Sequence, residues 1–137
     1  MYSPKKLYWE DKLKTGDDNI DFQHQYLFET FNKLGDAIFA EHGKDAISTI
    51  LDRLKFYAEW HFGKEEECMN RHSCPVAQTN KTAHATFLDM FNKYYNEYQQ
   101  TGGSNELAIK IHESLSDWFL NHVIGIDTKL YTCIHKK

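Results

Sequence analysis

Histidine and carboxylate side chains recur in this 137-residue chain at spacings that could assemble a metal site. His61 and Glu65 are four residues apart, which on a helix places them on one face, about 6 Å apart along the axis. His122 and Asp127 are five residues apart, and this spacing fits a helix if Gly125 permits a local π-type widening. Imidazoles bind iron, zinc or copper, and carboxylates bridge two metals and balance their charge. These residue types favour a two-metal site.

The elements that must position these residues are predicted from the spacing of apolar residues. Helical periodicity covers residues 19–40, 45–69, 76–99 and 105–132, each to within a few positions, and residues 1–18 form an irregular arm. Because the connections are short, we predict one all-α domain over residues 1–137, an up-down-up-down antiparallel four-helix bundle. Each helix then offers at least one imidazole to the interior: His24, His61, His84 and His122.

Each histidine also has a simpler interpretation. A single histidine on an apolar stripe is more often a hydrogen-bonded core residue than a ligand, and an isolated His–Glu pair is often a surface pair. The metal interpretation rests on all four helices contributing together. It also rests on the cost of burying two carboxylates without a compensating cation.

Composition narrows the functional classes. The net charge of −4 disfavours binding to nucleic acid or to an anionic membrane. No apolar run approaches the ~20 residues of a membrane-spanning helix, and the first residues lack a signal-peptide core, so we expect a cytoplasmic protein. The odd number of cysteines (Cys68, Cys74 and Cys133) predicts three free thiols, and no CxxC pair supports a thiolate metal site.

The chain resembles the hemerythrin family over nearly its whole length. The matching positions are Trp9, Gly16, residues 20–28 (IDFQHQYLF), 61–66 (HFGKEE), Met69, Pro75, 84–88 (HATFL), 118–122 (WFLNH) and Asp127. The resemblance implies two non-haem iron ions, one bound by His24 and His61 and the other by His84 and His122. It also implies that Glu65 and Asp127 bridge the two ions, together with a solvent-derived oxo or hydroxo group.

The resemblance implies a dioxygen-binding protein used for carriage, storage or sensing. Four apolar residues next to the ligands are expected to form the dry wall of an oxygen pocket: Phe62, Trp118, Phe119 and Val123. The chief rival is a di-iron oxidase or peroxidase acting on dioxygen, peroxide or nitric oxide. Another is a metal-binding sensor module read by a protein partner, which the sequence does not identify.

The third helix departs from the family pattern of two histidines four residues apart. Asn80 occupies the first position and His84 the second. Asn80 leaves the second iron an open or water position, or ligates through its oxygen more weakly than an imidazole. In the third alternative another side chain substitutes, or the site is only partly metallated.

Four other histidines, and several polar residues near the ligands, have less specific interpretations. His72 is the nearest spare imidazole to Asn80, whereas His112 lies too far along the helix from His122. His42 and His135 are expected at the surface. Asp21 and Gln23 either orient ligand rings or, in the case of Asp21, cap a helix, and Glu66 and Glu67 are expected to be solvated.

Overall fold

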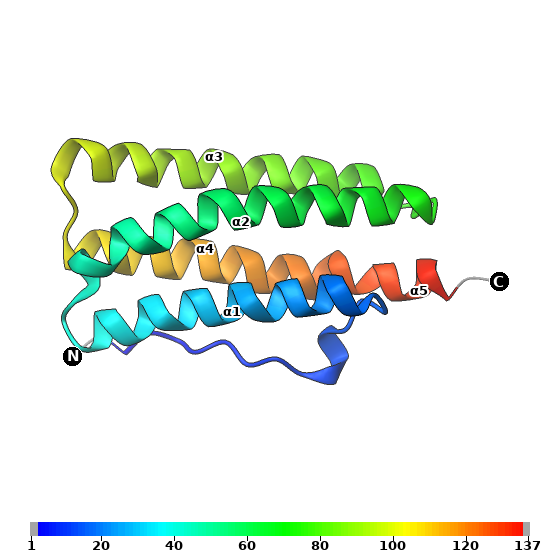
Figure 1. The fold of residues 1–137 in the computed structure, drawn as a ribbon, viewed down its shortest axis with the longest axis horizontal. Coiled ribbons are helices and arrows are strands. Elements are labelled where there is room, and N and C mark those ends of the chain that lie inside the picture. The colour runs from blue at the N-terminus through cyan, green and yellow to red at the C-terminus, as the bar shows by residue number, and fades with distance from the viewer. Residues whose placement is uncertain (1–2, 136–137) are drawn as a thin grey trace.

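The structure is a computed structural model that describes residues 3–135. Within them, four long helices pack side by side in alternating directions: α1 (Asp18–Phe39), α2 (Gly43–Arg71), α3 (Ala77–Thr101) and α4 (Asn105–Gly125) (Figure 1). Three short elements complete the described chain, η1 (Asp11–Leu13), η2 (Asp127–Lys129) and α5 (Leu130–Ile134). The predicted all-α four-helix bundle is confirmed, and the first three helices begin and end within about two residues of the predicted positions.

The bundle is held together by the apolar stripe of each helix. The buried stripe of α1 includes Leu27, Phe31 and Leu34, and that of α2 includes Leu51 and Leu54. Burying each such side chain contributes about 1.5–3 kcal/mol relative to leaving it in water. A second, smaller apolar cluster lies near the end where α2 stops and α5 begins, with these buried members: Cys68, Met69, Cys74 and Leu130.

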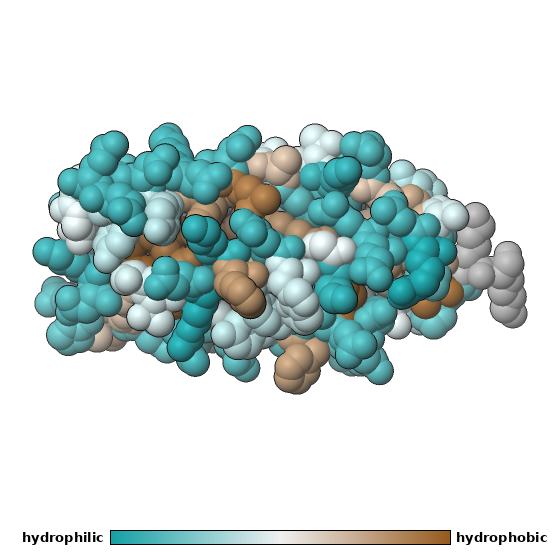
Figure 2. All heavy atoms as spheres, turned by 45° about the horizontal axis from the view of Figure 1, so that its top comes forward, coloured by the Kyte–Doolittle hydropathy of each residue, from teal (hydrophilic) through white to brown (hydrophobic). Residues whose placement is uncertain are grey.

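The surface contrasts with this interior. The face drawn in Figure 2 is mostly hydrophilic, with hydrophobic residues scattered between the polar ones. Among the helices of residues 3–135, none combines the length and the apolar character needed to cross a membrane.

The arm before α1 runs along the bundle and is anchored at two points (Figure 1). The backbone N–H of Leu7 donates to Asn32 Oδ1, and Asn32 Nδ2 donates to the Leu7 carbonyl, both over 2.8 Å. Thr15 donates through its backbone N–H and its hydroxyl to Asp21 Oδ1, over 2.8 and 2.9 Å. Asp21 therefore anchors the arm. The interpretation of Asp21 as a helix cap is wrong, because the cap of α1 is Asp17, which accepts from the Ile20 N–H. The ring-orienting alternative is wrong as well, because the hydrogen bonds of the Asp21 carboxylate come from Thr15 and not from an imidazole.

The region after His122 differs from the prediction. We expected one helix to residue 132, widened at Gly125, but α4 ends at Gly125 and the chain turns at Ile126 (φ −121°, ψ −55°). The Ile126 N–H still bonds to the His122 carbonyl over 2.9 Å, so the turn follows a regular last helical step without π widening. Asp127 opens η2 and is fully buried. Ending the helix, and not widening it, brings Asp127 back to the His122 side.

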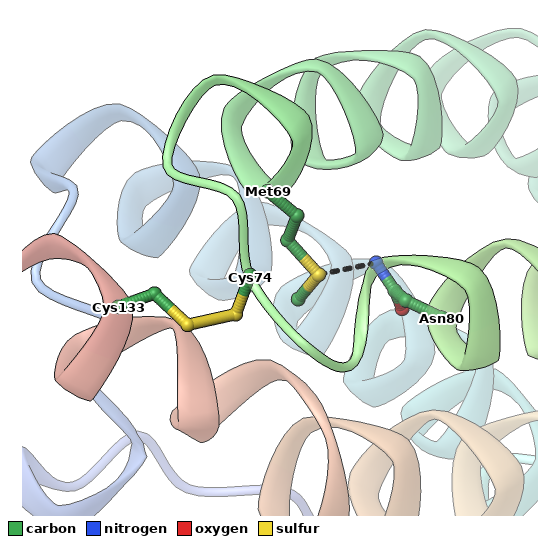
Figure 3. Close-up of a disulfide and its surroundings, with 4 residues drawn as sticks. All are labelled: Met69, Cys74, Asn80 and Cys133. Carbon is green, nitrogen blue, oxygen red and sulfur yellow. Dashed lines mark hydrogen bonds between the residues drawn. A yellow bond between two sulfur atoms is a disulfide. The ribbon is translucent and has the colours of Figure 1, made fainter.

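The cysteines also differ from the prediction of three free thiols. Cys74, in the loop before α3, and Cys133, in α5, form a disulfide with Cα atoms 5.5 Å apart (Figure 3). Cys68 is the one free cysteine of the described residues, and it is buried. The prediction failed for two of the three because α5 follows α4 to the end of the bundle where the α2–α3 loop also lies (Figure 1), which brings together residues that are 59 positions apart.

Candidate metal centre

The six residues predicted as ligands come together inside the bundle. Each of the four long helices contributes, with His24 from α1, His61 and Glu65 from α2, His84 from α3 and His122 from α4, and Asp127 from η2 completes the set. All six are at most 5% exposed. Their ligand atoms form two groups, each lying within 4.8 Å, one of His24, His61 and Glu65, the other of Glu65, His84, His122 and Asp127. Glu65 belongs to both groups.

Glu65 presents one carboxylate oxygen to each pair of histidines. Its Oε2 lies 2.9 Å from His24 Nε2 and 3.4 Å from His61 Nε2. Its Oε1 lies 3.0 Å from His84 Nε2 and 3.9 Å from His122 Nε2. This division of the two oxygens is the geometry that a bridging carboxylate needs.

Asp127, which belongs to η2, also reaches both histidine pairs. Its Oδ2 lies 3.1 Å from His24 Nε2, and its Oδ1 lies 3.1 Å from His122 Nε2. Two carboxylates therefore each reach both histidine pairs. The arrangement has the symmetry of a two-metal site with two shared ligands.

Metal ligation accounts for polar atoms in the centre that hydrogen bonds leave unpaired. Four buried atoms have no hydrogen-bond partner although they lie close to polar neighbours: His61 Nε2, His122 Nε2 and both Asp127 oxygens. Two ligand atoms at about 2.1 Å from one metal and at right angles to each other lie about 3 Å apart. Four of the six separations, between 2.9 and 3.1 Å, match this value, so the residues present fit a pair of metal ions.

Electrostatics show how strongly the site attracts positive charge. Burial by itself would lower the pKa of His24, but the contacts with Asp127 and Glu65 outweigh it and raise the pKa to about 10. The same opposition raises the pKa of His122 to about 9. Burial would raise the pKa of Glu65, yet the four surrounding histidines hold it well below its ordinary value. Without a bound cation, protons on the imidazoles balance the carboxylates.

Two of the imidazoles are oriented by side chains behind them. The Nδ1 of His61 lies 2.7 Å from Gln23 Oε1, and the Nδ1 of His84 lies 2.9 Å from Glu66 Oε2. An oxygen that accepts the Nδ1 proton leaves Nε2 free to bind a metal. Gln23 thus follows the ring-orienting alternative. The expectation that Glu66 is solvated is wrong, because its half-buried carboxylate faces α3.

Three of the four residues predicted to line an oxygen pocket contact the imidazoles. Phe62 stacks on His84 with ring centroids 3.8 Å apart, and Trp118 stacks on His122 at 4.5 Å. Phe119 meets His24 edge-on at 5.6 Å, and Val123 is fully buried. These contacts exclude water from the rings, and whether they line a dioxygen site stays a prediction.

Asn80 lies at the edge of the centre and is fully buried. Its Nδ2 donates to Glu65 Oε1 over 3.0 Å and to Met69 Sδ over 3.3 Å, whereas its Oδ1 has no hydrogen-bond partner (Figure 3). The amide therefore contacts Glu65 on the side of the second histidine pair.

Four other histidines belong to neither ligand group: His42, His72, His112 and His135. None of them supplies the imidazole that is missing at position 80.

Comparison with known proteins agrees with this geometry. The model of the hemerythrin HHE cation binding domain matches residues 15–134. A bacteriohemerythrin from Stenotrophomonas maltophilia is 30% identical over 88% of this chain and 76% of its own length, and one from Clostridium acetobutylicum is 30% identical over 87% and 94%. A myohemerythrin from Riftia pachyptila is 28% identical over 92% of both chains. The chain belongs to the hemerythrin family.

Proposed function

We propose that this protein holds two non-haem iron ions and binds dioxygen, in the service of oxygen carriage, storage or sensing. The observation that carries the proposal is the division of both carboxylates between two histidine pairs, because a mononuclear site would not need it. Membership of the hemerythrin family supports iron as the metal and dioxygen as the ligand. Bound iron would supply the electrons that dioxygen binding requires.

Each residue of the centre then has a defined task. His24 and His61 would hold one iron, His84 and His122 would hold the other, and Glu65 and Asp127 would be shared between them. Gln23 and Glu66 keep the Nδ1 protons of His61 and His84 in place, so that the Nε2 atoms point to the metals. The dry wall around the imidazoles keeps water and protons from the reacting oxygen: Phe62, Trp118, Phe119 and Val123.

Asn80 makes the second iron site poorer in protein ligands. The Asn80 amide donates its N–H group to Glu65, so toward this carboxylate it acts as a hydrogen-bond donor. We infer that Asn80 orients the bridging carboxylate and leaves the iron of His84 and His122 an open or water position. The hydrogen bond from Asn80 also draws negative charge away from the bridging Glu65 carboxylate.

The same feature favours a second candidate function, that of a di-iron oxidase or peroxidase acting on dioxygen, peroxide or nitric oxide. An extra open position beside the bridge would let water or peroxide reach an iron held by His84 and His122. With an external reductant, bound iron would then supply the electrons for further reduction of oxygen.

An absorption spectrum separates the two functions. Protein reconstituted with ferrous iron under anaerobic conditions is measured before oxygen, after oxygen, and after sparging with argon. A visible band that appears with oxygen and disappears with argon supports reversible binding. Direct passage to a stable ferric spectrum, followed by steady turnover with a reductant, contradicts carriage and supports the enzyme.

A further inference from the structure

The sulfur-containing end of the bundle, which the iron centre does not use, lies directly beside it. Met69 forms the connection, since its sulfur accepts from Asn80 Nδ2 over 3.3 Å and its carbonyl accepts from the Cys74 N–H over 2.9 Å. Figure 3 shows Met69 lying between Asn80 and the disulfide of Cys74 and Cys133. A short series of contacts thus leads from the disulfide through Met69 and Asn80 to Glu65.

The disulfide also fastens the two chain segments that reach the second histidine pair. Cys74 lies six residues before Asn80, and Cys133 lies six residues after Asp127. Cys133 belongs to α5, which has five residues and directly follows η2, the element that carries Asp127. A helix this short is not stable by itself, so its position depends on the crosslink and on the packing of Leu130.

We propose that Cys74 and Cys133 are a reversible thiol–disulfide site, oxidised by peroxide, whose crosslink tightens the hold of the bundle on the second iron. The coupling to iron rests on the proposed function, whereas the thiol chemistry does not. Cys133 is half-buried whereas Cys74 is only 5% exposed, so small oxidants and dithiols would approach the pair from the side of Cys133. In a reducing compartment such pairs serve redox sensing more often than permanent stabilisation.

The reaction is balanced with hydrogen peroxide as the oxidant. One cysteine thiolate attacks a peroxide oxygen, the O–O bond breaks, and a sulfenic acid and hydroxide form; the hydroxide takes up the proton that the thiol released and becomes water. The second thiolate attacks the sulfenic sulfur, the S–O bond breaks, and the leaving hydroxide takes a proton to give a second water. Two thiols and one peroxide thus give one disulfide and two waters, and a dithiol reductant reverses the change by thiol–disulfide exchange.

Loss of the crosslink is expected to act on the centre through Asp127 and Asn80. Both Asp127 oxygens face histidine nitrogens of the two pairs. When α5 is released, η2 gains freedom and the bridge from Asp127 loosens. Metal affinity then falls, by roughly tenfold for the weaker-bound iron if the loss resembles that of an outer-shell partner.

The experiment compares oxidised and reduced forms of the full chain. Thiols are counted by alkylation and mass spectrometry after an unfolding quench, first as isolated, then after a dithiol under native conditions, then after added hydrogen peroxide. We expect one thiol in the disulfide form, three after reduction, and one again after peroxide. A disulfide that only denaturant allows a dithiol to break, or that peroxide does not restore, overturns the proposal.

Iron affinity is then measured by chelator competition on both forms, and on Cys74→Ser with Cys68→Ser as the matched control. Cys68 lies in the same apolar cluster but outside the disulfide. Reduction and Cys74→Ser should weaken the second iron, and Cys68→Ser should not. Equal affinity in the oxidised and reduced forms overturns the coupling. If the oxidised protein binds fewer than two irons, the proposed function fails, while the thiol counts still decide the cysteine site.

Discussion

At the scale of single residues, Glu65 organises the centre, because it touches all four histidines and belongs to both ligand groups. Its i+4 spacing from His61 was visible in the sequence and predicted a shared helix face. What the spacing could not show is that each oxygen would face a different histidine pair, since this depends on how α1, α3 and α4 are placed around α2.

Replacing Glu65 by Gln should abolish two-metal binding, because the amide is neutral and does not bridge two cations well. Iron content by elemental analysis should fall from two per chain to one or fewer. Glu67→Gln is the matched control, since Glu67 is exposed on the same helix. Two irons retained in Glu65→Gln would contradict the assignment of Glu65 as a bridge.

Asn80 is a residue whose replacement should improve the site. Asn80→His places an imidazole beside the second pair, so we expect tighter iron binding and slower autoxidation in air. The rate of autoxidation is measured from the decay of the visible band. Asn70→His places an imidazole on the exposed face of α2 and should change neither property. An Asn80→His protein that autoxidises as fast as the unsubstituted protein would show that our account of Asn80 is wrong.

The protonation of His24 and His122 predicts two effects of pH. A metal binds neutral imidazole, so iron uptake must expel protons below pKa values of about 10 and about 9, and affinity should rise with pH up to that range. In chelator-treated protein the stability of the fold depends on pH in the opposite direction to the iron affinity. Pairing raises both pKa values above the ordinary 6.5, so its stabilisation is complete below about pH 6.5 and is lost as pH rises through 9 to 10.

Calorimetry in two buffers of different ionisation enthalpy measures the released protons, and urea unfolding of chelator-treated protein at pH 6 and pH 10 measures stability. Iron binding at neutral pH without proton release would contradict these protonation states.

At the scale of helices and turns, apolar periodicity predicted the first three helices closely, because each buries a continuous stripe. The end of the fourth helix was harder to predict, since residues 126–132 continue the apolar pattern while the backbone turns at Ile126. Glu66 was missed for a similar reason. It is 18 residues from His84, and only the pairing of α2 with α3 brings the two side chains together.

Two glycines of α2 should respond oppositely to substitution by alanine. A Cβ on Gly43 would collide with Asn105 Oδ1 and would lie 2.9 Å from the Ala108 Cβ, whereas a Cβ on Gly63 has nothing within 4 Å. Gly43→Ala should destabilise the fold by about 1–3 kcal/mol through overpacking. Gly63→Ala should stabilise it by about 0.5–1 kcal/mol through helix propensity.

Chemical denaturation of the two variants tests this contrast between the tight start of α2 and its open middle. Equal effects of the same sign would mean that α2 and α4 do not approach each other at Gly43 as the structure has them.

At the scale of the whole molecule, the bundle brings four histidines from four helices to one interior point, and the resemblance to hemerythrins already implied which residues these would be. The disulfide lay beyond such reasoning. An odd cysteine count argued against a disulfide framework, and nothing local pairs Cys74 with Cys133 across 59 residues. The contact forms only because the bundle places α5 and the α2–α3 loop at the same end (Figure 1).

The central claim is that one chain holds two bridged iron ions, and Mössbauer spectroscopy of protein reconstituted with ⁵⁷Fe tests it most directly. After oxidation we expect two iron ions per chain, both high-spin ferric and both giving quadrupole doublets. In an applied field the spectrum should be that of a diamagnetic ground state, because the two ions are coupled through their bridges. A single iron per chain, or two uncoupled paramagnetic ferric ions, would contradict the shared bridges of Glu65 and Asp127.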